Sequence, residues 1–533
     1  MTSTAATASE KTAAVTAADR LAPSVPATLF ICLSLFAVFA GQHRILNSDG
    51  DLPRHIRHGL YMLQHHSLIW RDPFSFTRLG DPFVPFEYGS QLLYALVYRS
   101  VGLPGITVLA GCLIGATYAL MARMLLRRGV DPLLAFLATA AGAILGFPHW
   151  MARPHLFSWV AIVLCLSLVE PARRRSLWAV PLLFIIWANV HGGWLYGIAL
   201  FGIYLVGHLL EYWLFGRRRE ELFAARYFAL AIPLALVATL VTPMGPRLWM
   251  HVHSFLGERF LLDNTSEFQS PDFHPIAAKG LLAILLITIA ALIVSRRRVH
   301  MTRLILVLAS LSWALISARN LPLFGMSAIA ATTLHIDHEW RHLPGSWLAR
   351  RRAAFAKGAA HASSVGWILL SSITLILFAV RGGRLMGAQV LADNFDASVF
   401  PVKAVRTARA ANLEGRIFSD FTWGGYLLLA WPEQRVFIDG GTDFYGNELA
   451  REFVTVNNLE PGWRSVLERR GIDLVLTGAH TKLARELVRT PGWAVWYCDP
   501  VAVLVQRTSA STAVTPDARE RAVVDCTGGL EAE

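Results

Sequence analysis

The sequence predicts a polytopic α-helical membrane protein with about eleven transmembrane helices, followed by an extracytoplasmic α/β domain. Of the 533 residues, 54% are hydrophobic and only 16% are charged, and the mean hydropathy is +0.44. Soluble globular domains of this size do not normally have this composition. Apolar runs of roughly 16 to 23 residues recur along the chain, near the ~20 residues that a helix needs to cross a bilayer.

Five short arginine clusters lie between the apolar runs, one after every second run. Because the cytoplasmic loops of membrane proteins carry an excess of Lys and Arg, we expect these clusters and the N-terminus in the cytoplasm and the intervening loops outside. The net charge of +12 is therefore assigned to topology, and no nucleic-acid partner is expected. The clusters are Arg127-Arg128, Arg173-Arg174-Arg175, Arg217-Arg218-Arg219, Arg296-Arg297-Arg298 and Arg350-Arg351-Arg352.

Residues 1–22 are expected to form a disordered cytoplasmic tail, because they are rich in Ala and Thr and have no apolar periodicity. Residues 23–392 form the predicted membrane domain. Its first apolar run could serve as a signal peptide, but cleavage would remove the anchor just before an acidic stretch, so we interpret it as an uncleaved span. The predicted spans are approximately 26–42, 104–126, 133–148, 155–171, 177–191, 193–215, 227–244, 276–295, 303–318, 321–335 and 364–381.

Two regions are predicted to lie outside the membrane. Residues 43–103 form a long, proline-containing outward loop, and the amphipathic stretch from Tyr88 to Val101 predicts a helix on the membrane surface. Residues 393–507 have more charge and shorter apolar segments, which indicates a folded periplasmic domain. An odd number of spans places this domain on the same side as loop 43–103, and residues 508–533 are expected to form a flexible tail.

Short segments with β-branched centres predict strands in this domain at 416–420, 435–439, 473–477 and 501–506. Residues 461–470 and 482–489 are predicted helices between them, and the alternation favours an α/β domain. The five cysteines include no C-x-x-C pair, so the sequence indicates neither a zinc site nor a disulfide framework. A bridge between Cys498 and Cys526 is conceivable in an oxidising exterior.

The acidic stretch after the first span, from Asn47 to Gly59, is the strongest candidate for chemistry, since ionisable residues at a membrane face usually have a function. Asp51 precedes Leu-Pro and would suit a helix N-cap, which is its structural alternative. Asp49, next to Gly50, could be a turn residue. On the helix that follows, His55 and His58 fall on the same face as Asp51, so the cluster could act as a general base or, through Asp49, Asp51 and His55, bind Mg²⁺ or Mn²⁺. No other cofactor is indicated.

Polar residues also stand at the outward ends of other spans. Arg153 and Arg319 could each bind a phosphate bidentately, with His155 beside Arg153, although arginines at such positions also snorkel to lipid headgroups. His191, next to two glycines, is a candidate substrate ligand or an interfacial histidine with satisfied hydrogen bonds. Glu87, at the start of the surface helix, could bind substrate or complement the helix dipole.

In the outer domain, Trp423 and Tyr426 follow Asp420, and Asp439 precedes two glycines after a predicted strand. Aromatic and carboxylate side chains on glycine-rich loops could bind a sugar or peptide acceptor. The alternative is turn chemistry together with core aromatics.

Taken together, these motifs resemble the GT-C superfamily of membrane glycosyltransferases. The resemblance rests on Asp at the end of the first span, the Asp51-x-x-Arg54-His55-x-x-x-Gly59 run, the Asp72-Pro73-Phe74 sequence and the outer C-terminal domain. Bacterial protein mannosyltransferase-like and aminoarabinose transferase-like enzymes are one branch suggested, and oligosaccharyltransferase catalytic subunits are the other. The latter have a Trp-Trp-Asp-Tyr-Gly motif, whereas this chain has Thr-Trp-Gly-Gly-Tyr at 422–426 and lacks the Asp.

The resemblance implies inverting transfer of a sugar from a polyprenyl-phosphate donor to a glycan, lipid or protein acceptor, at the outer face of a bacterial inner membrane. Asp51 or Asp49 would deprotonate or orient the acceptor hydroxyl, and Arg153 and Arg319 would stabilise the departing phosphate. Two other functions fit a chain with many spans: a lipid or glycan transporter or flippase, and a non-catalytic envelope-assembly protein. Transporters often contain internal repeats and helices interrupted at the midplane, and no such repeat is evident in this sequence.

Overall fold

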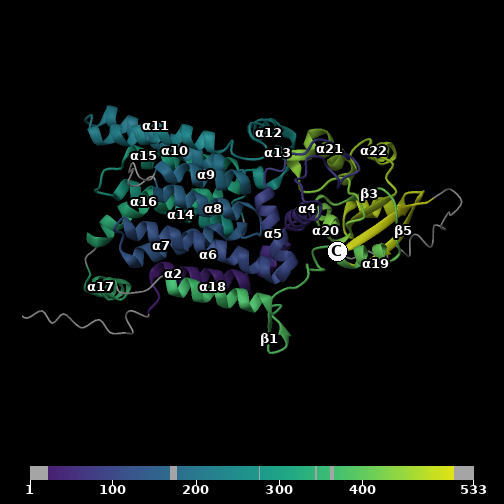
Figure 1. Cartoon of the computed structure of the whole chain (residues 1–533), viewed down its shortest axis with the longest axis horizontal. Coiled ribbons are helices and arrows are strands. Elements are labelled where there is room, and N and C mark those ends of the chain that lie inside the picture. Colours follow the sequence, from purple (N-terminus) through teal and green to yellow (C-terminus); the bar gives the residue numbers. More distant parts are fainter. Residues whose placement is uncertain (1–21, 169–176, 275, 343–344, 361–364, 509–533) are drawn as a thin grey trace, which may run out of the picture.

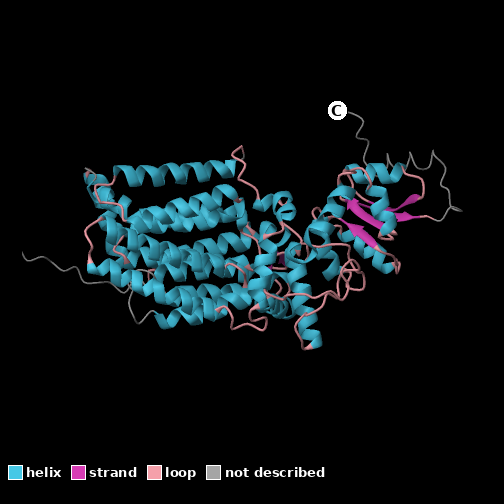
Figure 2. Ribbon diagram, turned by 90° about the horizontal axis from the view of Figure 1, so that it is seen from above, coloured by secondary structure: helices cyan, strands magenta, loops and turns pink. Residues whose placement is uncertain are grey.

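A computed structural model describes residues 22–168, 177–274, 276–342, 345–360 and 365–508. A bundle of roughly parallel helices forms one end of the molecule, and a smaller lobe with the main sheet forms the other (Figure 1). In Figure 2, the four-stranded sheet lies far from the helix bundle. The predicted terminal tails and Arg173-Arg174-Arg175 lie outside the described residues, apart from Ala22 and Thr508.

Each predicted span coincides with a helix. Four of these helices are long and apolar enough to cross a membrane by length and composition alone, namely α6, α7 with its 3₁₀ extension η2 (Phe147–His149), α10 and α11, while most of the others are shorter apolar helices. The number of spans therefore stays a prediction. The helices are α2 (Val25–Leu35, continued by the π-helical turn η1, Phe36–Ala40), α6 (Leu103–Arg127), α7 (Pro132–Gly146), α8 (His155–Leu168), α9 (Ala179–Val190), α10 (Trp194–Leu214), α11 (Arg219–Ala238), α14 (Ile276–Val294), α15 (Met301–Ile316), α16 (Leu321–His342) and α18 (Val365–Val380).

The largest difference from a predicted span concerns α11. The span expected at 227–244 is α11, which begins at Arg219 and ends at Ala238. Glu220 and Glu221 lie in its first turn, where carboxylates favour the positive end of the helix dipole. A hydropathy pattern detects only the apolar part of such a helix, so the predicted start lies too far along the sequence.

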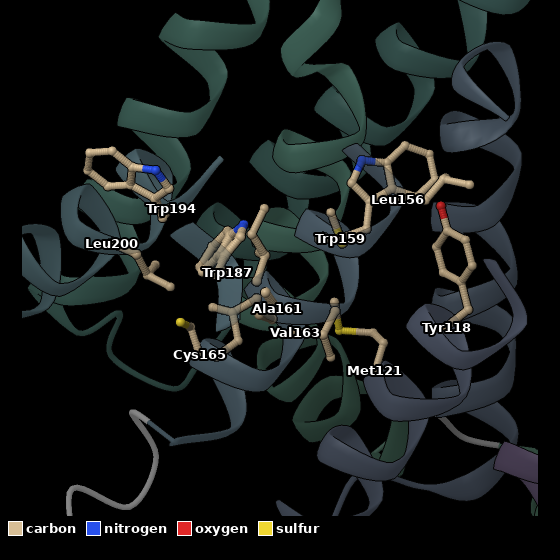
Figure 3. Packing of buried hydrophobic residues seen from close by; sticks show 14 of the residues in the cluster. Tyr118, Met121, Leu156, Trp159, Ala161, Val163, Cys165, Trp187, Trp194 and Leu200 are labelled. Carbon is tan, nitrogen blue, oxygen red and sulfur yellow. The ribbon is translucent and has the colours of Figure 1, made fainter. Parts of the chain in front are cut away.

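Large aromatic side chains are part of the buried core of the bundle. Tyr118 from α6, Trp159 from α8, Trp187 from α9 and Trp194 from α10 are all buried, and Figure 3 shows these side chains among smaller apolar ones. Helices packed in this way present their outer ends at fixed positions. Residues at those ends can therefore be held in a defined geometry.

Shorter helices cover the ends of the bundle that face the C-terminal lobe, which are called the outer ends below. These helices are α3 (Gln42–Asn47), α4 (Asp51–His65), α5 (Tyr88–Val101), α12 (Arg247–Leu256), α13 (Arg259–Asn264) and the 3₁₀ turns η4 (Ser266–Phe268) and η5 (Ala318–Asn320). Helix α5 runs across the ends of the spanning helices (Figure 1), as expected of a helix parallel to the membrane surface. It packs closely on α4, since a Cβ at Gly59 would lie 2.0 Å from the carbonyl oxygen of Gln91. On the opposite side of the membrane domain, helix α17 (Ser346–Ala360) precedes α18.

The C-terminal lobe contains a mixed sheet with strand order β3-β4-β6-β5. Strands β3 (Ile417–Ser419) and β4 (Leu474–Gly478) are parallel, whereas β6 (Ala502–Arg507) is antiparallel to β4 and to β5 (Trp493–Cys498). The surrounding helices are α19 (Val402–Ala410), α20 (Phe421–Ala430), α21 (Thr442–Asn457), α22 (Trp463–Arg469) and α23 (Lys482–Arg489), and a small hairpin, β1 (Arg384–Leu385) and β2 (Ala388–Gln389), precedes the lobe.

Two predictions for this lobe were wrong, and one of its strands was not predicted. The strand expected at 435–439 is reduced to isolated bridges from Val436 to Ser75 and to Ile417. Strand β5 was not predicted. Trp423 and Tyr426 lie inside helix α20 rather than on a loop, because Asp420 caps that helix by accepting the N–H of Thr422 at 2.9 Å, which carries the two glycines into its first turns.

Candidate active site

A cavity of about 990 Å³ lies where the outer ends of the spans meet the C-terminal lobe. Its wall combines the α3–α4 junction, the turn before α8, the α9–α10 junction, α12 to η4, η5, and the starts of α20 and α21. Eight of the residues singled out in the sequence line it: Asp49, Asp51, His55, Glu87, Arg153, His155, His191 and Arg319.

The two aspartates have different local roles. Asp49 Oδ1 accepts the backbone N–H of Asp51 at 2.9 Å, whereas the N-cap residue of α4 is Gly50 and Asp51 lies in the first turn. The structural alternative for Asp51, a role as helix N-cap, is therefore not what the structure shows, since Asp49 makes the local hydrogen bond. The carboxylate of Asp51 is left to face the cavity, and burial raises its pKa although the nearby Arg153 opposes the shift.

Arg153 is surrounded by three carboxylates. Its Nη2 lies 2.7 Å from Asp49 Oδ2 and 3.1 Å from Asp51 Oδ2, and its Nη1 donates to both oxygens of Glu267 at 2.9 and 3.2 Å. This guanidinium is already engaged, so it is poorly placed to receive a phosphate. Sequence reasoning missed Glu267, which lies in η4 with no motif around it.

Arg319 is the second arginine predicted to bind phosphate. Its guanidinium carbon lies 5.3 Å from the centre of the Phe268 ring. Among the ion pairs between described residues, Arg319 appears in none, so its donors are available to an anion that enters the cavity.

Glu87 lies between two histidines in the same cavity. Its carboxylate oxygens are 3.8 Å from His55 Nδ1 and 3.7 Å from His191 Nε2. Burial raises the pKa of Glu87 to about 7, despite the opposing charge of Arg54. At neutral pH this carboxyl therefore exists in both protonation states and can either donate or accept a proton.

The hydrogen bonds around His191 determine its tautomer. Trp187 Nε1 donates to Ser158 Oγ at 2.7 Å, which leaves the hydroxyl proton of Ser158 for His191 Nδ1 at 2.7 Å. Gly193 N–H donates to the same nitrogen at 3.0 Å. Because Nδ1 accepts, neutral His191 carries its proton on Nε2, the atom that faces Glu87. His191 is thus a fixed N–H donor in the cavity.

In His155 the protonated ring nitrogen faces the backbone. Its Nε2 donates to the backbone carbonyl of His149 at 2.9 Å, so its Nδ1 carries no proton. His155 lies at the first position of α8, directly after Arg153-Pro154. It therefore offers an acceptor where His191 offers a donor.

Four residues predicted to bind substrate do not line the cavity. His58 stacks on the ring of Phe74, with centroids 4.6 Å apart. Trp423 and Tyr426 are buried in the core of the lobe, where Trp423 donates to the Val399 carbonyl and Tyr426 stacks on Phe400. Asp439 is buried and accepts hydrogen bonds from Gly441 N–H at 2.7 Å and Tyr445 O–H at 3.1 Å. At Trp423, Tyr426 and Asp439 the contacts are therefore those of the structural alternative, namely core aromatics and turn hydrogen bonds.

The predicted metal ligands do not converge either. Arg153 occupies the space next to Asp49 and Asp51, and His55 Nδ1 contacts Glu87 and the amide of Gln91 instead. Within the described residues, three metal-compatible donor atoms come within 4.8 Å of one another at His208, Glu221 and His300. There His300 Nδ1 accepts the Thr302 N–H, so its Nε2 carries the proton that it shares with Glu221 at 3.1 Å. That group is hydrogen-bonded in a way that opposes metal ligation.

The C-terminal lobe closes the cavity by tight backbone approach. A Cβ at Gly440 would lie 1.9 Å from Asp51 Oδ1, and one at Gly425 would lie 2.0 Å from the carbonyl oxygen of Gly50. His251 of α12 pairs with Asp443 of α21 at 3.1 Å. The two glycines were expected on loops that bind an acceptor, whereas in the structure they allow the lobe to reach the start of α4.

No family model matches this sequence, nor does any curated protein. Among solved structures, the archaeal oligosaccharyltransferase AglB from Archaeoglobus fulgidus, in complex with an inhibitory peptide and a dolichol-phosphate, is similar with a TM-score of 0.51 at 12% identity, over 85% of this chain and 69% of that chain. The apo form of the Archaeoglobus fulgidus oligosaccharyltransferase gives 0.50 at 12% identity over the same shares. ArnT from Cupriavidus metallidurans bound to undecaprenyl phosphate gives 0.46 at 15% identity, over 92% of this chain and 99% of that chain. The chain therefore has the fold of these two oligosaccharyltransferase structures, as the resemblance in the sequence implied.

Proposed function

We propose that this protein is a membrane glycosyltransferase that moves a sugar from a polyprenyl-phosphate-linked donor to an acceptor hydroxyl or amide outside the cytoplasm. One observation carries the proposal: a single cavity at the outer ends of the spans is lined by Asp51 and by Arg319, which forms no ion pair with any described residue. Such a cavity offers a base for an acceptor and a cation for a departing phosphate. The GT-C fold supports the same reaction class, and dolichol-phosphate is bound to one structure with this fold.

In the proposed reaction, the acceptor heteroatom attacks the anomeric carbon and loses its proton to Asp51. The bond between the anomeric carbon and the phosphate oxygen breaks with inversion, and the lipid phosphate departs with the electron pair. Arg319 binds that phosphate, and the fixed Nε2–H of His191 can donate to the sugar or the phosphate. Because a phosphate is a good leaving group, positioning of the two substrates supplies much of the rate.

The apolar part of the cavity suits a lipid-linked donor. Trp159, Ile162, Leu195 and Leu323 from the spanning helices line it together with the charged groups. A ligand with an isoprenoid chain and a phosphate headgroup would satisfy both parts of this surface.

An outer location for the active site is part of the proposal. Cys498 in β5 is disulfide-bonded, and disulfides persist in oxidising compartments such as the bacterial periplasm. The arginine clusters at the opposite ends of the spans favour the same orientation, with the protein in the bacterial inner membrane.

The proposal is tested with purified protein in lipid nanodiscs, a polyprenyl-phosphate sugar donor and a panel of glycan, lipid and peptide acceptors. We expect Asp51→Asn to lose at least about 100-fold in turnover, the usual range for a general base. Asp81→Asn is the matched control, because its carboxylate is in the same outer loop but is 46% exposed. Full transfer by folded Asp51→Asn would overturn the assignment, and transbilayer movement of the donor without transfer would indicate a flippase.

A further inference from the structure

The ring of acids around Arg153 has the composition of a cation site. Asp49, Asp51 and Glu267 come from two separate segments, the α3–α4 junction and η4, and their carboxylates all face one point. Their side chains are 15%, 17% and 27% exposed. Carboxylates that are removed from water need a positive charge among them, and oxygen ligands of this kind are those that Mg²⁺ and Mn²⁺ take.

In this protein the positive charge among the carboxylates is a side chain, the guanidinium of Arg153. The Oδ2 atoms of both aspartates lie next to Nη2 of Arg153, and both oxygens of Glu267 accept from Nη1. The carboxylate atoms that a metal ion would use therefore already contact the guanidinium. Arg153 is 13% exposed, and its planar group has a fork geometry that suits several carboxylates at once.

The backbone is held in place around both Arg153 and Glu267, which limits displacement of the guanidinium from the carboxylates by a metal ion. Arg153 N–H donates to the Met151 carbonyl at 2.8 Å, and Pro154 follows it, so the backbone of this turn is constrained. Glu267 is held from the other side, where Ser317 Oγ donates to its backbone carbonyl at 3.0 Å. The acids and their cation are thus held by different elements and meet only in the folded protein.

We propose that Arg153 is the resident cation of this site and that the enzyme works without a divalent metal ion. Its guanidinium keeps the carboxylate of Asp51 in place and holds Glu267 against the cavity, while Arg319 alone receives the leaving phosphate. Arg153 is a positioning residue in this scheme. The roles given to these residues in turnover rest on the proposed function. The statement that Arg153 takes the place of a metal ion among the three carboxylates does not.

The first test measures metal binding and needs no activity. Mn²⁺ is titrated into metal-free full-length protein in detergent, and free Mn²⁺ is followed by electron paramagnetic resonance. Wild type should bind no stoichiometric Mn²⁺ at the site formed by Asp49, Asp51 and Glu267. Arg153→Ala should bind Mn²⁺ there at least about tenfold more tightly than wild type, since the three carboxylates are then left without their counter-charge. Arg153→Lys, which keeps the charge, should not gain it.

Arg319→Ala is the matched control, because it removes an arginine from the same cavity that is not surrounded by carboxylates. It should leave Mn²⁺ binding as in wild type. A triple variant of Arg153→Ala with Asp49→Asn and Asp51→Asn should lose the gained site, which separates it from binding at His208, Glu221 and His300. Stoichiometric Mn²⁺ binding by wild type that is lost in Asp49→Asn/Asp51→Asn, or no gain in folded Arg153→Ala, would overturn the proposal.

The second test uses turnover, once transfer has been established for wild type. EDTA treatment should leave wild-type turnover unchanged, and Arg153→Ala should have low turnover that Mn²⁺ partly restores. Loss of wild-type turnover in EDTA with recovery in Mg²⁺ or Mn²⁺ would contradict the inference and leave the glycosyltransferase proposal standing. No transfer by wild type under any condition would overturn the proposed function, while the binding result would still be valid.

Discussion

Ser158 Oγ lies 2.7 Å from Nδ1 of His191 and connects it to the indole of Trp187. The bond orders a ring at the junction of α9 and α10 through a side chain of α8. We expect Ser158→Ala to reduce kcat roughly tenfold, because losing one buried hydrogen bond costs on the order of 1 kcal/mol and leaves only the Gly193 N–H to orient the ring. Ser158→Thr keeps the hydroxyl and should retain most activity. Steady-state kinetics with a lipid-linked donor would check this, and equal losses in both variants would contradict it.

Gly440 is predicted to tolerate no side chain. A Cβ would lie 1.9 Å from Asp51 Oδ1, so Gly440→Ala must displace Asp51 or the start of α21. We expect a loss of about 100-fold in kcat/KM, the usual cost of misplacing a catalytic group by about 1 Å. Gly202→Ala is the control, since its Cβ meets nothing within 4 Å. Wild-type turnover by Gly440→Ala would show that this close approach is absent in the working enzyme.

The ion pair between His251 and Asp443 should couple the α12 segment to the C-terminal lobe. Their side-chain atoms are 3.1 Å apart, and each side chain is 15% exposed. A double-mutant cycle of His251→Ala and Asp443→Asn, measured by thermal unfolding in detergent, should give a coupling energy of about 1–2 kcal/mol. Additive effects of the two substitutions would mean that the pair does not hold the segment.

Glu87 should make stability depend on pH. Burial raises its pKa from an ordinary value of 4.5 to about 7, so the folded protein binds an extra proton between these values. Its stabilising contribution is complete below pH 4.5 and is lost as the pH rises to about 7, up to roughly 3 kcal/mol in total. The Tm of wild type should therefore fall relative to Glu87→Gln across this range. Glu448→Gln, whose side chain is 77% exposed, should follow the wild-type profile.

The topology can be tested at Cys498. Cys32, Cys112 and Cys165 are free, whereas Cys498 is disulfide-bonded. In intact cells of a variant with the three free cysteines replaced by alanine, a membrane-impermeant maleimide should label Cys498 only after reduction, as mass spectrometry of the tryptic peptides would show. Labelling that requires lysis would place the lobe in the cytoplasm.

Elements that are specified by neighbouring residues in the sequence could be predicted closely. The apolar runs predict the helices of the bundle, and the span expected at 321–335 differs from α16 mainly because its last turns carry polar residues. The helix expected at 482–489 matches α23, whose N-cap is Thr481. By contrast, Val436 looked like part of a strand because its segment is β-branched, but it bridges to Ser75 in the outer loop, a partner more than 300 residues away.

The sequence by itself determined that the chain is a helical membrane protein with a C-terminal α/β lobe, and it identified Asp49, Asp51, Arg153, His191 and Arg319 as polar groups at one end of the spans. These properties follow from composition and periodicity. Only the tertiary structure decided which of the two arginines is surrounded by carboxylates, because that depends on Glu267, which reaches Arg153 from a segment 114 residues away. It also decided that Trp423 and Tyr426 belong to the core, because burial depends on what packs around a side chain.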